Sequence, residues 1–310
     1  MKCTRCHARA EVHIRHHNSA FCRGCYGTYF QRQVERAIHK EHMFTPDEDV
    51  LVAVSGGKDS LALWDALVTM GYRTTGLHLA LGIGDYSAIS TRKTEHFARE
   101  RGLRLLTVPL EDETPGLGIM RVAGATNRKA CAACGTVKRH YFDRIAAEQG
   151  FQVVATGHNL DDEAARLLGN VLHWQSDHLA KQSPVLVPTH EKFARKVKPF
   201  FRISEYETAV YAFFRGIDYV LDECPNSAGA TQLVYKDVLN RLEAAMPGTK
   251  LTFVQEFLRT GRPAFAGEAS SPPQTCESCG MPSYNGTCGF CRLVAEVTRR
   301  RNPLPHAGPA

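Results

Sequence analysis

The sequence has 310 residues, of which 43% are hydrophobic and 23% charged, and its formal net charge is +6. This composition is typical of a folded globular protein, and the length allows one large core with small satellite modules or two modest domains. No run approaches the roughly 18 apolar residues of a membrane span, and the N-terminal segment lacks an apolar signal core, so we expect a cytoplasmic protein with no membrane partner. The positive charge suits a polyanionic partner but identifies none.

Two Cys-x2-Cys pairs lie at the start of the chain. They consist of Cys3, Cys6, Cys22 and Cys25. Two residues between ligands allow a tight turn to direct both thiolates at one ion, and two such turns complete a four-thiolate zinc shell. Disulfide pairing is the alternative, but a reducing cytosol disfavours it. We therefore predict an N-terminal zinc finger over residues 1–30 and assign residues 31–48 to a linker helix. Residues 29–40 have helical composition and no breaker, which indicates the helix.

Strand and helix patterns alternate through the middle of the chain. Strands are predicted at 50–54, 74–79, 103–108 and 152–156, and helices at 59–70, 87–101, 136–149 and 160–173. Further helices are predicted at 204–215, 235–245 and 251–259. Alternation of this kind predicts an α/β fold with a doubly wound parallel sheet that binds ligands at the carboxyl ends of its strands. We assign residues 49–260 to this catalytic domain.

A glycine-rich loop follows the first of these strands. The segment Ser55-Gly56-Gly57-Lys58-Asp59-Ser60 opens a helix, so its backbone N–H groups and the lysine can hold phosphate oxygens. It is not a Walker A loop, because it lacks the earlier glycine and the Ser or Thr after the lysine. The segment matches SGGxDS, the PP-loop of ATP pyrophosphatases, which cleave ATP between the α and β phosphates.

Three cysteines lie in the middle of the sequence, at Cys131, Cys134 and Cys224. Three thiolates are consistent with an iron–sulfur cluster that leaves one iron open, or with a reactive pair that handles sulfur as a persulfide or transient disulfide. A third zinc site, with His140 or His158 as the fourth ligand, is the structural alternative. Spacing alone does not decide between them.

A second polar motif follows the fourth predicted strand. The run Gly157-His158-Asn159-Leu160-Asp161-Asp162-Glu163 places carboxylates at a strand end, where they can hold the Mg²⁺ that neutralises the departing pyrophosphate. Asp161 and Asp162 could instead cap the following helix. The run is similar to the GHN-x-DD motif of the tRNA-thiolating branch of this superfamily.

The end of the chain repeats the design of its beginning. Another two pairs, Cys276, Cys279, Cys288 and Cys291, predict a second zinc site. A stretch at 260–275 rich in Gly, Ala, Ser and Pro predicts a linker. We assign residues 261–310 to a C-terminal zinc finger with a disordered tail over residues 302–310.

Taken in order, these features resemble the tRNA-5-methyluridine 2-sulfurtransferases, the two-thiouridine synthetases that act on the T loop. The resemblance covers nearly the whole chain. It rests on both sets of terminal cysteines, SGGKDS, His78-Leu79 with the segment 81–87, Cys131-x2-Cys134-Gly135, Lys138, GHNLDDE and Cys224-Pro225.

The resemblance implies ATP-dependent 2-thiolation of the tRNA position-54 base. The C2 oxygen of the base would attack the α-phosphate, and sulfide would then displace AMP from the adenylate. It also implies that the three central cysteines hold a [4Fe–4S] cluster whose open iron presents sulfide, beside two Zn²⁺ and ATP with Mg²⁺. Catalytic residues would be Lys138, Asp162, Asp59 and Asp161. ATP would be bound by Ala53, Ser55, Gly56, Gly57, Lys58, Asp59, Ser60, His78, Leu79, Lys138, Gly157 and Asp162.

Partners also follow from the resemblance. They are tRNA, a ubiquitin-like sulfur-carrier protein with a thiocarboxylate end, and a second copy of the chain in a homodimer. Two alternatives remain: thiolation of the wobble uridine by a related PP-loop enzyme, and a non-catalytic, zinc-dependent nucleic-acid-binding protein.

Overall fold

A six-stranded sheet forms the centre of the computed structural model, which describes residues 1–113, 118–126, 129–227, 229–265 and 272–301. Its strand order is β5-β4-β3-β6-β8-β7. The strands are β3 (Val50–Ala53), β4 (Thr74–Ala80), β5 (Leu105–Pro109), β6 (Val153–Thr156), β7 (Val185–Leu186) and β8 (Arg195–Val197). All neighbours pair in parallel except β7, which runs antiparallel to β8 at the edge. The predicted doubly wound α/β sheet is confirmed, with one antiparallel edge strand added.

Alternate residues of the central strand enter different cores. Val50 and Val52 belong to one buried cluster and Leu51 to another. Since successive side chains of a strand point to opposite faces, the continuous apolar run is explained by helices on both sides. On the first side lie α1 (Arg23–Lys40), α2 (Lys58–Thr69), α7 (Leu160–Leu172) and α9 (Glu205–Arg215), and on the second lie α5 (Ile119–Ala125), α6 (Ala130–Gln149) and α12 (Gly289–Arg301).

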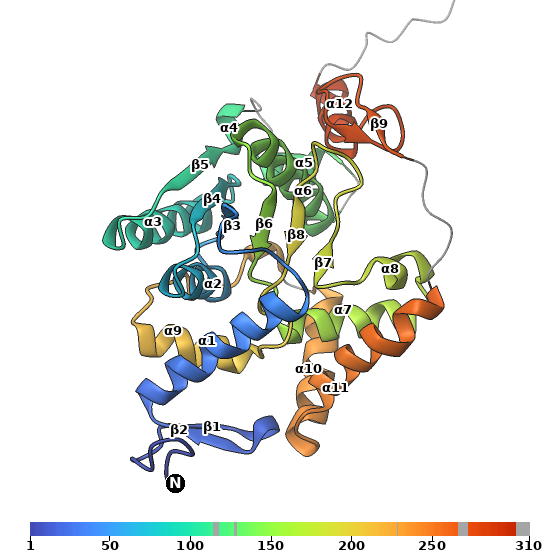
Figure 1. The fold of residues 1–310 in the computed structure, drawn as a ribbon. Helices are drawn as coiled ribbons and strands as arrows, with labels where there is room; N and C mark the ends of the chain where they lie inside the picture. Colours follow the sequence, from blue (N-terminus) through green and yellow to red (C-terminus); the bar gives the residue numbers. More distant parts are fainter. Residues whose placement is uncertain (114–117, 127–128, 228, 266–271, 302–310) are drawn as a thin grey trace, which may run out of the picture.

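Several helices complete the domain around the sheet (Figure 1). They are α3 (Gly84–Glu100), α4 (Leu110–Glu113), α8 (Ser176–Lys181), α10 (Thr231–Ala245) and α11 (Thr249–Glu256). Short turns are η1 (Arg15–His17), η2 (Pro225–Ser227), η3 (Phe257–Gly261) and η4 (Arg262–Phe265). The predicted linker is therefore helical in its first part, while the predicted disordered tail at 302–310 lies outside the described residues. No helix among the described residues is long and apolar enough to cross a membrane.

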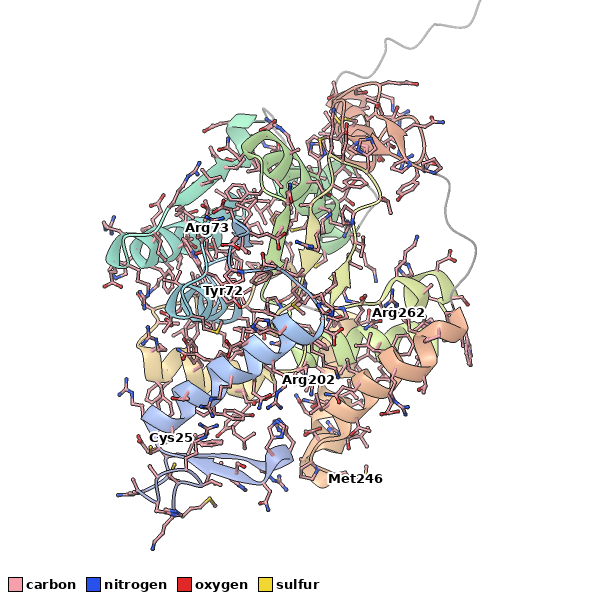
Figure 2. The ribbon with its side chains drawn as sticks, in the orientation of Figure 1. Cys25, Tyr72, Arg73, Arg202, Met246 and Arg262 are labelled. Carbon is pink, nitrogen blue, oxygen red and sulfur yellow. The ribbon has the colours of Figure 1, made fainter. Side chains whose placement is uncertain are left out.

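The terminal modules lie at opposite ends of the molecule (Figure 1). The first is the hairpin of β1 (Val12–Ile14) and β2 (Ser19–Phe21), joined to the start of α1, and Figure 2 marks Cys25 near this junction. The second contains the pair β9 (Gln274–Thr275) and β10 (Pro282–Ser283) together with α12. Its Cys276, Cys288 and Phe290 are part of the second buried cluster, so this module packs directly against the core.

Three helices begin at least four residues earlier than predicted. Helix α1 starts at Arg23 rather than residue 29, α6 at Ala130 rather than residue 136, and α10 at Thr231 rather than residue 235. In the first two cases the added turns contain Cys and Gly, which have lower helix propensity than the residues that follow. Consequently Cys131 and Cys134 both lie on helix α6. Cys134 is four residues before Lys138 on this helix.

Candidate active site

The glycine loop lies at the carboxyl end of β3, where helix α2 begins. Gly57 is the N-cap of α2 and no side chain caps it, so the first N–H groups of the helix are free to bind an anion. Gly56 has φ +77°, and a Cβ there would meet the carbonyl oxygen of Ser90 at 2.7 Å. Ser60 donates from its hydroxyl to the Gly57 carbonyl at 3.0 Å and closes the turn. The loop therefore has the geometry expected of a phosphate-binding turn.

The second motif lies beside this loop, at the end of the neighbouring strand β6. A Cβ on Gly157 would come within 2.9 Å of the backbone of Asp59 and Ser60, so the two loops are in contact. Asn159 caps α7 in a capping box with Asp162, and its amide also donates to Asp59 at 3.2 Å. Asp162 therefore takes part in capping α7, which is the alternative role predicted for it from the sequence. It also lines the cavity described next.

A cavity of about 300 Å³ opens between these strand ends. The predicted residues that line it are Ala53, Ser55, Asp59, Ser60, His78, Leu79, Cys134, Lys138, Gly157, Asp162 and Cys224. Leu81, Ile83, Tyr86 and Phe142, which were not assigned to the site, add an apolar wall. A nucleobase could pack against this wall while its phosphates reach the glycine loop. These apolar residues carry no motif of their own, although three of them lie in the segment 81–87 that supported the resemblance.

His78 and His158 contribute to the cavity wall in their neutral form. Burial lowers the pKa of both imidazoles. The His78 ring contacts the carbonyl of Val54 at 2.9 Å and the hydroxyl of Thr91 at 2.9 Å, so both its nitrogens are already bonded. His158 is bonded through Nδ1 to the Thr156 hydroxyl at 2.8 Å. His78 can therefore border a ligand, but it cannot donate to one without breaking a bond.

Five predicted residues do not line the cavity: Gly56, Gly57, Lys58, Asp161 and Cys131. Asp161 is 5% exposed, pairs with the Lys250 ammonium, and accepts from the backbone N–H of Glu205 at 2.8 Å. It therefore anchors α9 and α11 to the start of α7 and does not line the cavity. This geometry gives Asp161 a supporting position rather than a reacting one.

A chain of alternating charges runs behind the cavity. Lys58 pairs with Asp59 and with Glu205, at 2.9 Å each. Lys236 pairs with Asp162 at 2.7 Å and with Glu205 at 3.1 Å. Glu205 and Lys236 were not found by sequence reasoning, because α9 and α10 carry no motif and no pattern indicates that they meet the loop.

These ion pairs fix the ionisation of the central members. Burial alone would raise the pKa of Glu205, but Lys236 and Lys58 outweigh it and lower the pKa to about 2. Burial alone would lower the pKa of Lys236, but Asp162 and Glu205 outweigh it and raise the pKa. Both lysines therefore stay positively charged next to the loop at neutral pH.

The three central cysteines come together on one side of this cavity. Cys134 and Cys224 line it, and the Cys131 thiol contacts the carbonyl of Asn226, two residues beyond Cys224, at 3.3 Å. Burial raises the pKa of the Cys134 thiol; Lys138 opposes this effect, and Cys224 and Cys131 add to it. The thiols of Cys134 and Cys224 thus share one cavity with the glycine loop.

The spacing of these thiols differs from that of the terminal ones. Among the described residues, Cys131, Cys134 and Cys224 do not form a group whose ligand atoms all lie within 4.8 Å of one another, as one metal ion would require. His140, a possible fourth zinc ligand, instead stacks on Phe290 of the C-terminal module at 4.1 Å. A cluster that binds each thiolate to a different iron tolerates wider spacing than a single ion does.

Both terminal sets of cysteines form compact groups. Each set of four has its thiols within 4.8 Å of one another. The Cys6 and Cys22 sulfurs are 3.6 Å apart and those of Cys279 and Cys288 are 3.7 Å apart. A tetrahedron with Zn–S bonds of about 2.3 Å has edges of about 3.8 Å. The two groups fit a single tetrahedral ion each, and all eleven cysteines of the chain are free of disulfides.

Comparison with known families gives two matches that together cover most of the chain. Residues 27–231 match a family described as a PP-loop domain. Residues 2–26 match one described as the N-terminal LIM domain of the 2-thiouridine synthetase TtuA.

Curated relatives and a solved structure agree with these matches. The chain is 49% identical over 300 residues to the tRNA-5-methyluridine(54) 2-sulfurtransferase of Thermus thermophilus, covering 97% of this chain and 93% of the relative. It is 41% identical to the enzyme of the same name from Pyrococcus horikoshii, covering 94% and 93%. The structure of the U34-tRNA thiolase NcsA from Methanococcus maripaludis with its [4Fe-4S] cluster aligns with a TM-score of 0.81 at 25% identity, covering 94% of this chain and 95% of that chain.

Proposed function

The chain belongs to the family of tRNA-5-methyluridine(54) 2-sulfurtransferases, and we propose that it replaces the C2 oxygen of this T-loop base with sulfur in an ATP-dependent reaction. The observation that carries the proposal is the shared cavity. Lys138, Cys134 and Cys224 line the same space as Ser55 and Ser60 of the glycine loop. One bound nucleotide could therefore meet both the phosphate loop and the sulfur-handling side.

The loop and the two strand ends would hold ATP. The free N–H groups at the start of α2 face the position of the phosphates, and the apolar wall of Leu79, Leu81 and Ile83 would enclose the adenine. Asp59 and Asp162 both line the cavity and offer carboxylate oxygens for Mg²⁺ between the phosphates. Lys138 enters from α6 on the opposite side, where it could stabilise charge on the α-phosphate as the base attacks.

Activation is needed because the C2 oxygen is a poor leaving group. The C2 oxygen forms a bond to the α-phosphorus, pyrophosphate departs with the electron pair of the broken P–O bond, and the base loses its N3 proton. Attack of sulfide at C2 then expels AMP. Holding both partners in a fixed geometry would account for much of the acceleration.

We assign a [4Fe–4S] cluster to Cys131, Cys134 and Cys224, and one Zn²⁺ to each terminal group. When bound, the cluster would supply an open iron that can carry the sulfide. Cys134 and Cys224 line the cavity, Cys131 contacts Asn226 near Cys224, and the three thiols are too widely spaced for one ion, which supports this assignment. The tetrahedral spacing of the terminal thiols supports zinc, and their free state suits a reducing cytoplasm.

Two partners besides tRNA belong to the same proposal. A small ubiquitin-like protein with a thiocarboxylate end would deliver the sulfur. A homodimer would bury the apolar stripe of α10, whose exposed residues are Val234, Val238, Leu242 and Met246 at four-residue intervals; Figure 2 marks Met246 at the lower end of this helix. Light scattering should give twice the chain mass, and a monomeric mass at micromolar concentration would contradict the dimer.

The test of the function is a thiolation assay with anaerobically reconstituted protein. Unmodified tRNA, ATP and sulfide should yield 2-thiolation mapped to position 54, together with AMP and pyrophosphate. Cys224→Ser should abolish thiolation and the visible iron–sulfur absorbance, but retain ATP binding, because the glycine loop lies on other elements.

Each other result identifies a different function. Thiolation at the wobble position would replace the T-loop assignment with that of the U34 enzymes. Tight tRNA binding by protein that neither binds ATP nor thiolates would identify a non-catalytic binding protein. Colourless protein with three zinc ions would refute the cluster.

A further inference from the structure

Lys236 is a positive charge beside the phosphate loop that the proposed mechanism has not used. Its ammonium lies 2.7 Å from Asp162 and 3.1 Å from Glu205, and the side chain is 19% exposed. It reaches this place from α10, more than 170 residues after the glycine loop in sequence. Lys58 reaches the other oxygen of Glu205 at 2.9 Å, so one carboxylate holds two lysines.

The charges of the side chains in this group do not cancel. Asp59, Glu205 and Asp162 contribute three negative charges, and Lys58 and Lys236 contribute two positive ones. The net charge is therefore −1 before any ligand arrives. Mg²⁺ bound by Asp59 and Asp162 would replace the two lysines as the counter-ion of these carboxylates, which frees both ammonium groups for phosphate oxygens.

The adenylation step creates a need for such groups. As the bond from the C2 oxygen to the α-phosphorus forms, the bond between that phosphorus and the α,β-bridging oxygen breaks. Its electron pair stays on pyrophosphate, whose negative charge rises at the end of α2. Ammonium groups that are already charged and held close by can stabilise this charge with little reorganisation.

We propose that Lys236 is a second ammonium ligand of the leaving pyrophosphate, acting with Lys58, and that Glu205 positions both lysines beside the loop. This inference rests on the proposed function, since it concerns the pyrophosphate which that reaction releases. It predicts that Lys236 contributes to binding of the β and γ phosphates and not to binding of AMP.

A purely structural role is the competing explanation. The pair with Asp162 joins α10 to α7, and these two helices pack along one another in the first core cluster through residues such as Leu239 and Leu167. If Lys236 served only as this link, its loss would lower stability and would either weaken AMP and pyrophosphate binding alike or leave both unchanged. The two explanations therefore differ in which ligand is affected.

The experiment measures binding of Mg²⁺-pyrophosphate and of AMP to the full chain by titration calorimetry, without tRNA. Lys236→Gln keeps an N–H donor for Asp162 but removes the charge. We expect its pyrophosphate affinity to fall by roughly tenfold or more and its AMP affinity to stay unchanged. The reason is that a hydrogen bond to a charged group contributes more than one between neutral groups. Lys236→Arg should recover most of the loss.

Arg241→Ala is the matched control. Arg241 lies on the same helix, is 80% exposed, and pairs only with Asp237 among the contacts recorded for it. Removal of its charge should leave both affinities unchanged. An equal fall in this variant would show that the net charge of α10 is responsible, and would overturn the proposal.

The remaining outcomes are also decisive. Equal pyrophosphate affinity in wild type and Lys236→Gln overturns the inference and leaves the proposed function intact. A parallel loss of AMP and pyrophosphate affinity in both Lys236 variants, with a lower unfolding temperature, supports the structural link and also overturns it. No binding of pyrophosphate or ATP by the wild-type chain would overturn the proposed function itself.

Discussion

Gly157 shows how closely the two ligand-binding loops approach each other. A Cβ at this position would lie 2.9 Å from the carbonyl carbon and oxygen of Asp59 and 2.9 Å from the N–H nitrogen of Ser60. All three are backbone atoms, so the contact cannot be relieved by turning a side chain. The glycine loop and the α7 loop can share one ligand only because residue 157 has no side chain.

Gly157→Ala should therefore separate the two loops. We expect the free energy of unfolding to fall by about 1–3 kcal/mol, the usual cost of overpacking a tight contact. ATP affinity should fall about tenfold or more, because the phosphate N–H groups and Asp162 no longer face one ligand. Chemical denaturation and ATP titration measure the two effects.

Gly27→Ala is the control for this substitution. Gly27 lies within α1, and nothing is within 4 Å of the position of its Cβ. Alanine should be neutral or stabilise this helix by about 0.5–1 kcal/mol, without any change in ATP affinity. If Gly157→Ala bound ATP as tightly as wild type, the close approach of the loops would have no functional role.

At the residue scale, the sequence predicted most positions of the cavity but not the orientation of the side chains. The pattern SGGKDS fixes a backbone turn, and the backbone N–H groups lie as that pattern predicts. The Lys58 side chain, however, is directed by Glu205, which comes 147 residues later. Asp161 and Asp162 are neighbours in one motif, yet the helical turn sends one to Lys250 and the other to the cavity. The orientation of these side chains depends on partners from distant parts of the sequence, which no local pattern identifies.

At the element scale, helix α6 connects the C-terminal module to the cavity. It presents Cys134 and Lys138 to the cavity, while His140 stacks on Phe290 of α12 at 4.1 Å with an angle of 7° between the rings. Tyr141 contacts the same Phe290 edge to face at 5.5 Å. The module thus holds the helix that carries Cys134 and Lys138, to which we assign the reaction.

The stacking of His140 on Phe290 makes the stability of the protein depend on pH. Burial lowers the pKa of His140 to about 4, whereas in the unfolded chain it is about 6.5. Between these values the unfolded chain binds a proton that the folded chain does not, so stability falls as the pH drops from about 6.5 towards 4. His140→Phe keeps the stacked ring and removes the titration.

Between pH 7 and pH 5 the free energy of unfolding should fall less in His140→Phe than in wild type. We expect the difference to be about 1 kcal/mol after allowance for partial solvent screening. Denaturant unfolding of both proteins at the two pH values gives this difference. Loss of the zinc proposed for the terminal modules at low pH would affect both proteins alike, so it cancels in the comparison. Parallel pH profiles would mean that His140 titrates equally in the folded and unfolded chains.

Elements with strong periodicity were predicted correctly, and short ones were missed. Strands β7 and β8 have two and three residues: β7 lies in a short apolar run between Pro184 and Pro188, and β8 begins with Arg195 and Lys196, so neither shows a strand pattern. Their places in the sheet are set by pairing: β8 pairs with β6, and β7 pairs with β8 at the edge. The early start of α6 was missed because its cysteines and glycine are poor helix formers, although Ala133 of the added turn is buried in the second cluster and this packing favours the helix.

At the scale of the whole molecule, the two terminal modules are alike in sequence but differ in what they hold. The N-terminal module packs through Cys3 and Tyr26 into the cluster that contains α1, α2 and α9. The C-terminal module packs through Cys276 and Cys288 into the cluster that contains α6 and the cavity wall. The cysteine spacing predicted both groups, but only the fold shows that one of them supports the active site.

Loss of metal from each module should therefore have different consequences. Cys6 and Cys279 are matched, because each is the second cysteine of the first pair in its module and each is exposed. Cys279→Ser should loosen α6, raise hydrogen exchange across residues 130–149 by more than tenfold, and lower the iron bound per chain. The reason is that structural zinc contributes about 10–16 kcal/mol to the folding of such small modules, so a weakened site unfolds readily.

Cys6→Ser should instead raise exchange in β1, β2 and the start of α1, and leave α6 and the iron content at wild-type values. The two modules lie at opposite ends of the molecule (Figure 1), and α6 contributes to the second cluster but not to the first. Hydrogen-exchange mass spectrometry and metal analysis of both variants measure these effects side by side. If either substitution loosened α6 to the same extent, the chain would unfold as one unit, and the C-terminal module would have no particular role in holding Cys134 and Lys138 at the cavity.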